Sequence, residues 1–151
     1  MIHLIDINES NWLAAARLTV APEQYAYVAD AVGIIARGYV YRDCNARVWG
    51  IAKDDVLVGL ALVRGLDEEP ACYDLQQLMI DAKYQSCGYG TKALGMIIEK
   101  LRAEHAYDCV EVCVKKDDEA ALHVYKKAGF VDTGYIDECA PDCANLMLYF
   151  E

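Results

Sequence analysis

The sequence predicts an α/β (α+β) fold with a mixed, mostly antiparallel sheet of about seven strands and about four flanking helices. The first observation is the order of apolar strands and amphipathic helices, which is β α α β β β α β α β β. The second is a central unit of strand, glycine turn, helix and strand over residues 71–114. Such a unit implies two parallel strands joined by a right-handed crossover, with antiparallel hairpins on either side.

A chain of 151 residues is of the size that one hydrophobic core supports, so residues 1–151 are expected to form a single domain. Hydrophobic residues make up 56% of the sequence and charged residues 25%, as in a soluble globular protein. The sequence shows no repeat, linker or low-complexity segment.

The first third of the chain reads as a strand over residues 1–7, a short helix over 11–18 and a longer helix over 23–39. Pro22 suits the first turn of that longer helix. Residues 46–53 and 56–64 follow as a β-hairpin around a pair of aspartates.

The strand over residues 71–80 should place Tyr73, Leu75, Gln77 and Met79 on one face, because side chains alternate along a strand. After the glycine turn, an apolar stripe at helical spacing predicts a helix, and residues 108–114 read as a buried strand. A helix capped by Asp117 or Asp118 should then run to Gly129. Two strands, over residues 130–136 and 145–150, close the chain.

A net charge of −10 argues against nucleic-acid binding and favours cationic partners such as amines, although solubility alone would explain it equally well. No segment approaches the length of a membrane span, and the N-terminal residues do not resemble a signal peptide, so a cytoplasmic protein without membrane contact is expected. The seven cysteines lack the spacing of a zinc site, so no metal is expected.

The stretch Gln85-Ser86-Cys87-Gly88-Tyr89-Gly90 joins the central strand to its helix. Glycine permits positive φ and close approach of a ligand, and a helix N-terminus presents free N–H groups to a phosphate or pyrophosphate. Two glycine motifs are excluded. The dinucleotide fingerprint requires glycine where Ala93 stands, and the NTPase phosphate loop requires a different order from Gly90-Thr91-Lys92.

Together with its flanking elements, this stretch resembles the Gln/Arg-x-x-Gly-x-Gly/Ala signature of GNAT-type N-acetyltransferases. Residues 121–130, with Tyr125 and the pair Gly129-Phe130, resemble the second signature of that family. The resemblance covers nearly the whole chain. Residues 11–12, 22–24, 36–41 and 78–85 are also similar to the spermine/spermidine acetyltransferase branch, through a less specific match.

The resemblance implies that acetyl-CoA is the acetyl donor, with its thioester in a gap where the two central parallel strands splay apart. The residues expected to contact it are Leu78, Met79, Ile80, Gln85, Ser86, Cys87, Gly88, Tyr89, Gly90, Thr91, Asp118, Ala121, Tyr125 and Lys127. Tyr125 takes the place of the family's general acid, whereas by itself it would read as a core aromatic residue. Asp118 stands where the family often has Asn, so a simple helix cap is an alternative role.

Many relatives carry a glutamate base on the strand before the turn, where this chain has Gln76 and Gln77. Glu111 is the catalytic candidate in its place, with Asp74 or a water molecule as alternatives. The expected acceptor is a primary amine, namely a small polyamine such as spermidine or spermine, held by residues that include acids and an aromatic ring. These residues are Glu23, Tyr39, Asp74 and Gln77.

Other acceptors fit the same sequence: a protein N-terminus, an amino acid or an aminoglycoside. A non-catalytic acyl-CoA-binding module is a further alternative, because a fold does not fix a function. The apolar segment 146–150 could pair across a homodimer or lie inside the sheet.

Overall fold

The computed structural model describes all 151 residues, and its elements follow the predicted order. The strands are β1 (Ile2–Asp6), β2 (Arg47–Lys53), β3 (Val56–Leu66), β4 (Cys72–Ile80), β5 (Cys109–Lys115), β6 (Val131–Asp132) and β7 (Cys143–Tyr149). The helices are α1 (Trp12–Ala16), α2 (Ala31–Val40), α3 (Tyr89–Glu104) and α4 (Glu119–Lys127). The chain also forms three short 3₁₀ turns, which are η1 (Pro22–Gln24), η2 (Arg42–Cys44) and η3 (Ala82–Tyr84).

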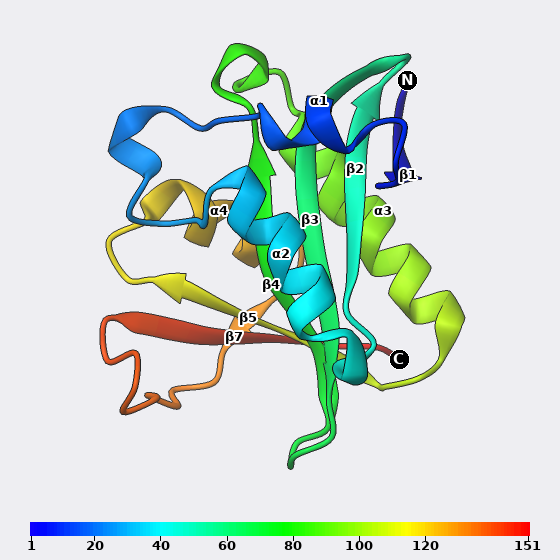
Figure 1. Cartoon of the computed structure of the whole chain (residues 1–151). Helices are drawn as coiled ribbons and strands as arrows, with labels where there is room; N and C mark the ends of the chain where they lie inside the picture. The colour runs from blue at the N-terminus through cyan, green and yellow to red at the C-terminus, as the bar shows by residue number, and fades with distance from the viewer.

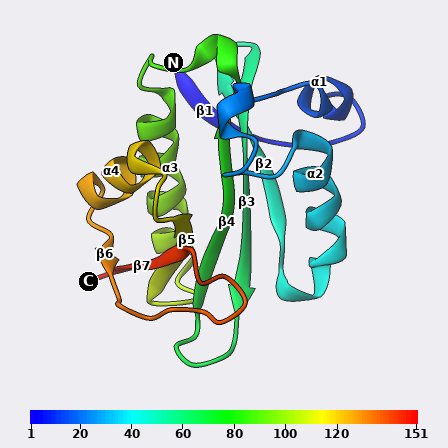
Figure 2. The ribbon, with the colours of Figure 1, turned by 90° about the vertical axis from the view of Figure 1, so that its left-hand side faces the viewer.

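The seven strands form one sheet in the order β1-β2-β3-β4-β5-β7-β6, and only the β4–β5 pair is parallel. This confirms the predicted mixed, mostly antiparallel sheet. Helices α1 and α2 cover one side of β3 and β4, and α3 and α4 lie on the other side (Figure 2). No helix combines the length and the apolar character that crossing a membrane requires.

Strands β4 and β5 separate soon after they meet. Their ladder holds only two register pairs, Tyr73 with Val110 and Asp74 with Glu111. Beyond these pairs β5 turns away across the view while β4 continues upright (Figure 1). Strand β5 still pairs with β7 along its whole length, so the half of the sheet formed by β5 and β7 diverges from β4 as a unit.

Strand β4 contains a β-bulge that the sequence pattern did not predict. The register passes from Leu62 opposite Gln77 to Val63 opposite Leu75, which leaves Gln76 without an opposite residue. An extra residue reverses the alternation of side chains beyond it. Leu75 therefore packs under α3, whereas Met79 packs under α1 and α2. The expectation that Tyr73, Leu75, Gln77 and Met79 share one face is wrong.

The predicted helix over residues 23–39 is also wrong in its first half. The chain forms only the turn η1 there, and α2 begins at Ala31. Asp30 caps this start, since its carboxylate accepts a hydrogen bond of 2.6 Å from the Gly33 N–H. Because an N-cap aspartate marks the start of a helix, Asp30 favours a break in the chain before α2 over one continuous helix. Residues 25–30 are thereby left as a non-helical segment between η1 and α2.

The last two strands differ from prediction in length. Strand β6 is only Val131–Asp132, and β7 begins at Cys143, two residues earlier than expected. Strand β7 lies inside the sheet, between β5 and β6. Residues 146–149 therefore belong to an internal strand of the sheet, which was one of the two predicted alternatives for residues 146–150.

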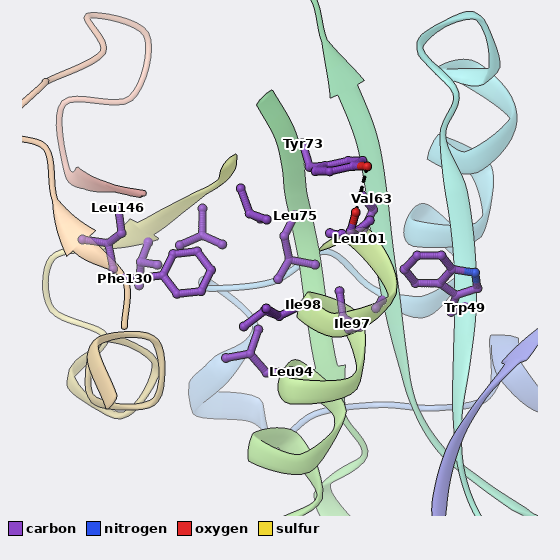
Figure 3. Packing of buried hydrophobic residues seen from close by; sticks show 14 of the residues in the cluster. Trp49, Val63, Tyr73, Leu75, Leu94, Ile97, Ile98, Leu101, Phe130 and Leu146 are labelled. Atoms are coloured by element: carbon purple, nitrogen blue, oxygen red, sulfur yellow. Dashed lines mark hydrogen bonds between the residues drawn. The ribbon is translucent and has the colours of Figure 1, made fainter. Parts of the chain in front are cut away.

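The two largest hydrophobic clusters pack the helices against the sheet. The larger lies beneath α3 and joins residues such as Trp49, Ile97 and Leu146 (Figure 3). Within it the Tyr73 hydroxyl donates to the Leu101 carbonyl at 3.0 Å and accepts from the Ala106 N–H at 3.1 Å, so its polar group is satisfied. The smaller cluster lies beneath α1 and α2 and includes Met79.

Candidate active site

A cleft of about 830 Å³ occupies the gap between the diverging strands. Its walls are residues 75–80 of β4 and residues 112–115 of β5. The glycine turn and the first residues of α3 form one end, and α4 lies alongside it. Residues from the segment before α2, among them Glu23 and Tyr27, contribute to the lining as well. The separation of β4 from β5 is thus what creates the cavity.

The glycine turn has an open surface above the start of α3. Gly88 caps the helix with φ of 80°, and no side chain accepts a hydrogen bond from the first N–H groups. A Cβ on Gly88 would meet nothing within 4 Å, and one on Gly90 would meet only an Ile80 side-chain carbon at 3.6 Å. The first turn of a 16-residue helix therefore presents N–H groups to the cleft, and this arrangement suits a phosphate or pyrophosphate.

Gln85 fastens this turn to the rest of the fold. Its side-chain amide donates to the Ile80 carbonyl at 2.9 Å and to the Gln24 side-chain oxygen at 2.8 Å. The first bond closes the turn onto the end of β4, and the second ties it to η1. The Gln85 side chain therefore shapes the turn, and the ligand-facing groups there are backbone N–H groups.

The last residues of β4 expose a strand edge to the cleft. Because the ladder with β5 stops at Asp74, the outward-facing backbone groups of residues 75–80, such as those of Leu78, have no neighbouring strand. An unpaired edge of this kind can bond to an extended ligand as it would to another strand. The edge points from the glycine turn towards the place where the strands diverge.

Tyr125 lies on α4 and lines the cleft. Its ring packs edge-on against Phe130, with ring centroids 5.4 Å apart and an interplanar angle of 73°. Burial, followed by the negative charge of Asp118, raises the pKa of its phenol. The side-chain hydrogen bonds of the structure leave its hydroxyl without a protein partner, so this protonated group is available to a ligand.

Asp74 and Glu111 face each other across the last β4–β5 register pair, at the closed end of the cleft. Burial raises the pKa of Asp74, and an ion pair with Arg64 at 2.9 Å opposes this rise. Burial and the charge of Asp74 raise the pKa of Glu111, whose carboxylate accepts a weak hydrogen bond from the Cys72 thiol at 3.6 Å. Neither carboxylate is part of the cleft lining.

The other predicted residues are distributed as follows. Twelve of the fourteen residues expected to contact the cofactor line the cleft. Cys87 and Lys127 do not, and both side chains are exposed. Of the residues expected to bind the acceptor, Glu23 and Gln77 line the cleft. Tyr39 is 68% exposed on α2 and lies outside the lining.

Sequence reasoning missed several lining residues, including Val20, Tyr27, Val28, Cys113 and His123. Tyr27 and Val28 were hidden by the expected helix over residues 23–39. Asp30 could have revealed these two residues, because aspartate is a preferred N-cap residue whose carboxylate bonds to the backbone N–H three positions on, here that of Gly33. A helix that starts after Asp30 leaves Tyr27 and Val28 outside it. No group of three or more His, Cys, Asp and Glu side chains is arranged to hold a metal ion.

Comparisons with known proteins agree with this architecture. The sequence profile of the Acetyltransferase (GNAT) family matches residues 6–130. No curated protein sequence matches the chain. The profile covers most of the chain, and the chain therefore belongs to the Acetyltransferase (GNAT) family, which confirms the family predicted from its two signatures.

Several solved structures share the fold. Spermidine N-acetyltransferase from Vibrio cholerae, in complex with CoA and spermine, has a TM-score of 0.76 at 14% identity, with 98% of this chain and 95% of that chain covered. An aminoglycoside acetyltransferase in complex with coenzyme A has a TM-score of 0.79 at 17% identity, with coverages of 99% and 95%. The ribosomal-protein-S18-alanine N-acetyltransferase from Escherichia coli reaches 0.73 at 16% identity, with coverages of 100% and 95%. At such identities the likeness establishes the fold alone.

Proposed function

We propose that this acetyltransferase moves the acetyl group of acetyl-CoA to a primary amine, and that the amine is a small polyamine such as spermidine or spermine. The observation that carries the proposal is the cleft itself. It has an anion-binding helix start at one end, an unpaired strand edge along one wall and a protonated tyrosine on the opposite side.

The cleft provides complementary groups for each part of acetyl-CoA. The N–H groups at the start of α3 would hold the pyrophosphate, because they carry the positive end of the helix dipole. The backbone edge of Leu78, Met79 and Ile80 would pair with the amide-bearing pantetheine arm. The thioester would then lie between β4 and β5, near Tyr125 and above the acid pair.

The reaction requires three proton and charge movements. The amine loses a proton and its lone pair attacks the thioester carbonyl, which places negative charge on the carbonyl oxygen. A backbone N–H of residues 78–80 would stabilise that oxygen. When the tetrahedral species collapses, the carbon–sulfur bond breaks and the CoA thiolate takes a proton from Tyr125. The nitrogen still carries a second proton after the attack, and its passage to the Tyr125 phenolate through water restores the phenol and leaves the neutral amide beside the free CoA thiol.

Glu111 is the proposed destination of the amine proton. Its raised pKa makes it a stronger base than an ordinary glutamate, which suits the removal of a proton from an ammonium group. Since Glu111 lies behind the cleft lining, a water molecule would connect it to the amine. Asp74 is the weaker candidate because Arg64 holds its carboxylate in an ion pair.

Three features support a cationic acceptor. Asp74 and Glu111 lie at the closed end of the cleft, and Asp137 is near enough to raise the pKa of Glu111 further. Arg64 pairs with only one of these three carboxylates, that of Asp74. The whole chain carries a net charge of −10, which attracts polyamines over long distances. The fold shared with spermidine N-acetyltransferase is compatible with this choice.

An acceptor panel tests the proposal. The protein is incubated with acetyl-CoA and, separately, spermidine, an aminoglycoside and a peptide with an N-terminal alanine. The mass of each product and the value of kcat/KM for each amine are measured. We expect the largest kcat/KM for spermidine. A larger value for the aminoglycoside or for the peptide would reject the polyamine and identify the acceptor class instead.

A further inference from the structure

Cys113 places a thiol in the wall of the cleft. It belongs to β5, is exposed, and lines the cleft between Val112 and Val114. Strand β5 is one side of the gap in which the sulfur of acetyl-CoA is proposed to lie. A protein thiol and the thiol of bound CoA would therefore share this part of the cleft, and the proposed acetyl transfer uses no cysteine.

Cys143 lies next to this thiol on the neighbouring strand. Strands β5 and β7 are antiparallel neighbours, with Cys113 opposite Asn145 and Lys115 opposite Cys143 (Figure 1). Residues two apart on a strand share a face, so Cys113 and Cys143 are diagonal neighbours on one face of the sheet. The Cys113 thiol is hydrogen-bonded to Cys143, which is only 8% exposed and does not line the cleft. One thiol of the pair therefore faces the ligand site, and the other is buried beside it.

No other cysteine lines the cleft. The buried thiols of Cys72 and Cys109 have oxygen partners, the Glu111 carboxylate and the Ala71 carbonyl. The remaining cysteines are exposed and lie outside the lining, namely Cys44, Cys87 and Cys139. The pair of Cys113 and Cys143 is thus the dithiol that a ligand in the cleft can reach.

The surroundings of Cys113 keep its thiol protonated at neutral pH. Burial, followed by the hydrogen bond to Cys143 and the charges of Glu111 and Asp74, raises its pKa to about 12. Because the thiolate is the reactive form, this thiol reacts slowly near neutral pH and faster as the pH rises. A bound disulfide held against the thiol would offset part of this handicap, since proximity replaces a bimolecular encounter.

We propose that Cys113 and Cys143 form a redox-active pair that reduces the disulfide of coenzyme A in the cleft. The Cys113 thiolate attacks one sulfur of CoA disulfide, forms a mixed disulfide with one CoA and releases the other CoA as its thiolate. The Cys143 thiolate then attacks the Cys113 sulfur, forms the Cys113–Cys143 disulfide and releases the second CoA. The two protons that the cysteines lose are those that the two CoA thiolates gain. The inference rests on the CoA site of the proposed function, and it does not require acetyl transfer.

The second step is intramolecular, between two side chains that are already in contact. Diagonal neighbours on adjacent strands have Cα atoms about 7–8 Å apart, so closing the disulfide draws β5 and β7 slightly together. Strain of this kind makes a disulfide easy to reduce. An excess of CoA disulfide should therefore oxidise the pair, and dithiothreitol should restore both thiols.

The test follows thiol release, protein mass and peptide mass after reduced protein is mixed with excess CoA disulfide. In wild type, the peptides of Cys113 and Cys143 should become joined, with two CoA thiols released for each pair. Cys143→Ser should stop at a CoA adduct on Cys113, because the second thiol is missing. Cys113→Ser should leave Cys143 as a free thiol. No reaction at Cys113 in wild type, or oxidation of Cys143 in Cys113→Ser as fast as in wild type, would overturn the proposal.

Cys139→Ser is the control variant, and glutathione disulfide is the control oxidant. Cys139 is exposed, lies four residues before Cys143 and does not line the cleft, so its removal should leave the joined peptides unchanged. Glutathione disulfide has the same reactive bond without the nucleotide of CoA, and it should oxidise the pair about tenfold or more slowly. Equal rates with the two disulfides would reject recruitment of CoA disulfide by the cleft.

The pH dependence identifies the attacking thiol. The rate of adduct formation in Cys143→Ser should rise about tenfold for each pH unit from about pH 7 to about pH 9, because the pKa of Cys113 lies well above this range. A rate that levels off within the range would contradict attack by Cys113.

Acetyl transfer to the amine panel, measured on the same preparation, separates this inference from the proposed function. Disulfide exchange at Cys113 without acetyl transfer to any amine would reject the proposed function alone. Acetyl transfer without reaction at Cys113 would reject the redox role alone. Failure of both, together with no binding of acetyl-CoA, would reject the CoA site on which both depend.

Discussion

Tyr125 keeps its proton because its phenol is buried and lies near the negative charge of Asp118, and both effects raise its pKa. A donor to a departing thiolate must hold a proton at neutral pH, and this tyrosine does so. Its hydroxyl also has no competing partner in the protein, so its hydrogen bond is available to the leaving group. Its position in the cleft and its raised pKa support the general-acid role proposed for Tyr125.

Replacing this hydroxyl gives the first prediction. Tyr125→Phe should lower kcat about 100-fold, a typical contribution of general acid catalysis. The Kd of acetyl-CoA should change little, because the Phe ring retains the edge-on packing on Phe130. Steady-state kinetics and a binding titration measure the two quantities. A kcat equal to that of wild type would remove the acid role.

Glu111 gives the second residue-scale prediction. Its folded-state pKa is raised by burial and by Asp74, so the ionised form is present only above a pH higher than for an ordinary glutamate. The acid limb of kcat/KM for the amine should reflect this pKa. Glu111→Gln should remove that limb and lower kcat/KM at neutral pH about 100-fold, since an amide cannot act as the general base.

Stability provides the control for Glu111→Gln. A carboxyl whose pKa is raised on folding stabilises the folded state fully at pH values below its unfolded pKa, and this contribution is lost as pH rises through the folded pKa. At pH 7 the variant should therefore be at least as stable as wild type in denaturant unfolding. A variant that is both inactive and destabilised would indicate a structural role for Glu111.

At the scale of elements, the glycine turn at the start of α3 is the proposed binding site for the pyrophosphate of acetyl-CoA. Gly90 lies in the helix, and a Cβ there would meet only an Ile80 side-chain carbon at an ordinary contact distance of 3.6 Å, so a methyl group fits the protein and would obstruct only a ligand. Gly90→Ala should therefore weaken acetyl-CoA binding about tenfold or more while leaving the melting temperature unchanged or slightly higher. Binding titration and thermal unfolding measure both.

Gly95→Ala is the control for this prediction. Gly95 is also in α3, and a Cβ there would meet nothing within 4 Å. The substitution should stabilise the helix by about 0.5–1 kcal/mol and leave acetyl-CoA affinity unchanged. If Gly90→Ala bound acetyl-CoA as tightly as Gly95→Ala does, the turn would not be the pyrophosphate site.

The same scale shows what the sequence could and could not predict. The strand order, the crossover helix and the glycine turn followed from local patterns of apolar residues and glycine. The bulge at Gln76 did not, because an extra residue in one strand is visible only against its partner. Tyr27 was missed as a lining residue because apolar spacing favoured a helix over residues 23–39, whereas the Asp30 N-cap lets α2 start only at Ala31. The acid pair of Asp74 and Glu111 required the register between two distant strands.

At the scale of the whole molecule, charge adds a force that no single contact supplies. A net charge of −10 attracts a polyamine over long distances. Salt weakens this attraction, because the Debye length falls from about 10 Å at 0.1 M to about 3 Å at 1 M ionic strength. Raising the salt concentration should therefore increase KM for spermidine several-fold relative to KM for acetyl-CoA. Butylamine, with one charge, should show a shallower dependence. Equal dependence for the two amines would reject electrostatic recruitment.

The cleft is also a property of the whole sheet. Strands β1 to β4 form one half and β5 to β7 the other, and they meet through two register pairs. The cleft exists because the halves diverge, and α3 connects them behind it. The start of α3, the end of β4 and Tyr125 of α4 come from separate elements that line this one cavity.

The measurement that tests the central claim most directly is the release of CoA thiol from acetyl-CoA in the presence of spermidine, followed with time and matched to the mass of the acetylated amine. The account predicts thiol release with multiple turnovers, in a one-to-one ratio with monoacetylated product. Tight binding of acetyl-CoA without thiol release, with spermidine and with every other amine tried, would contradict it.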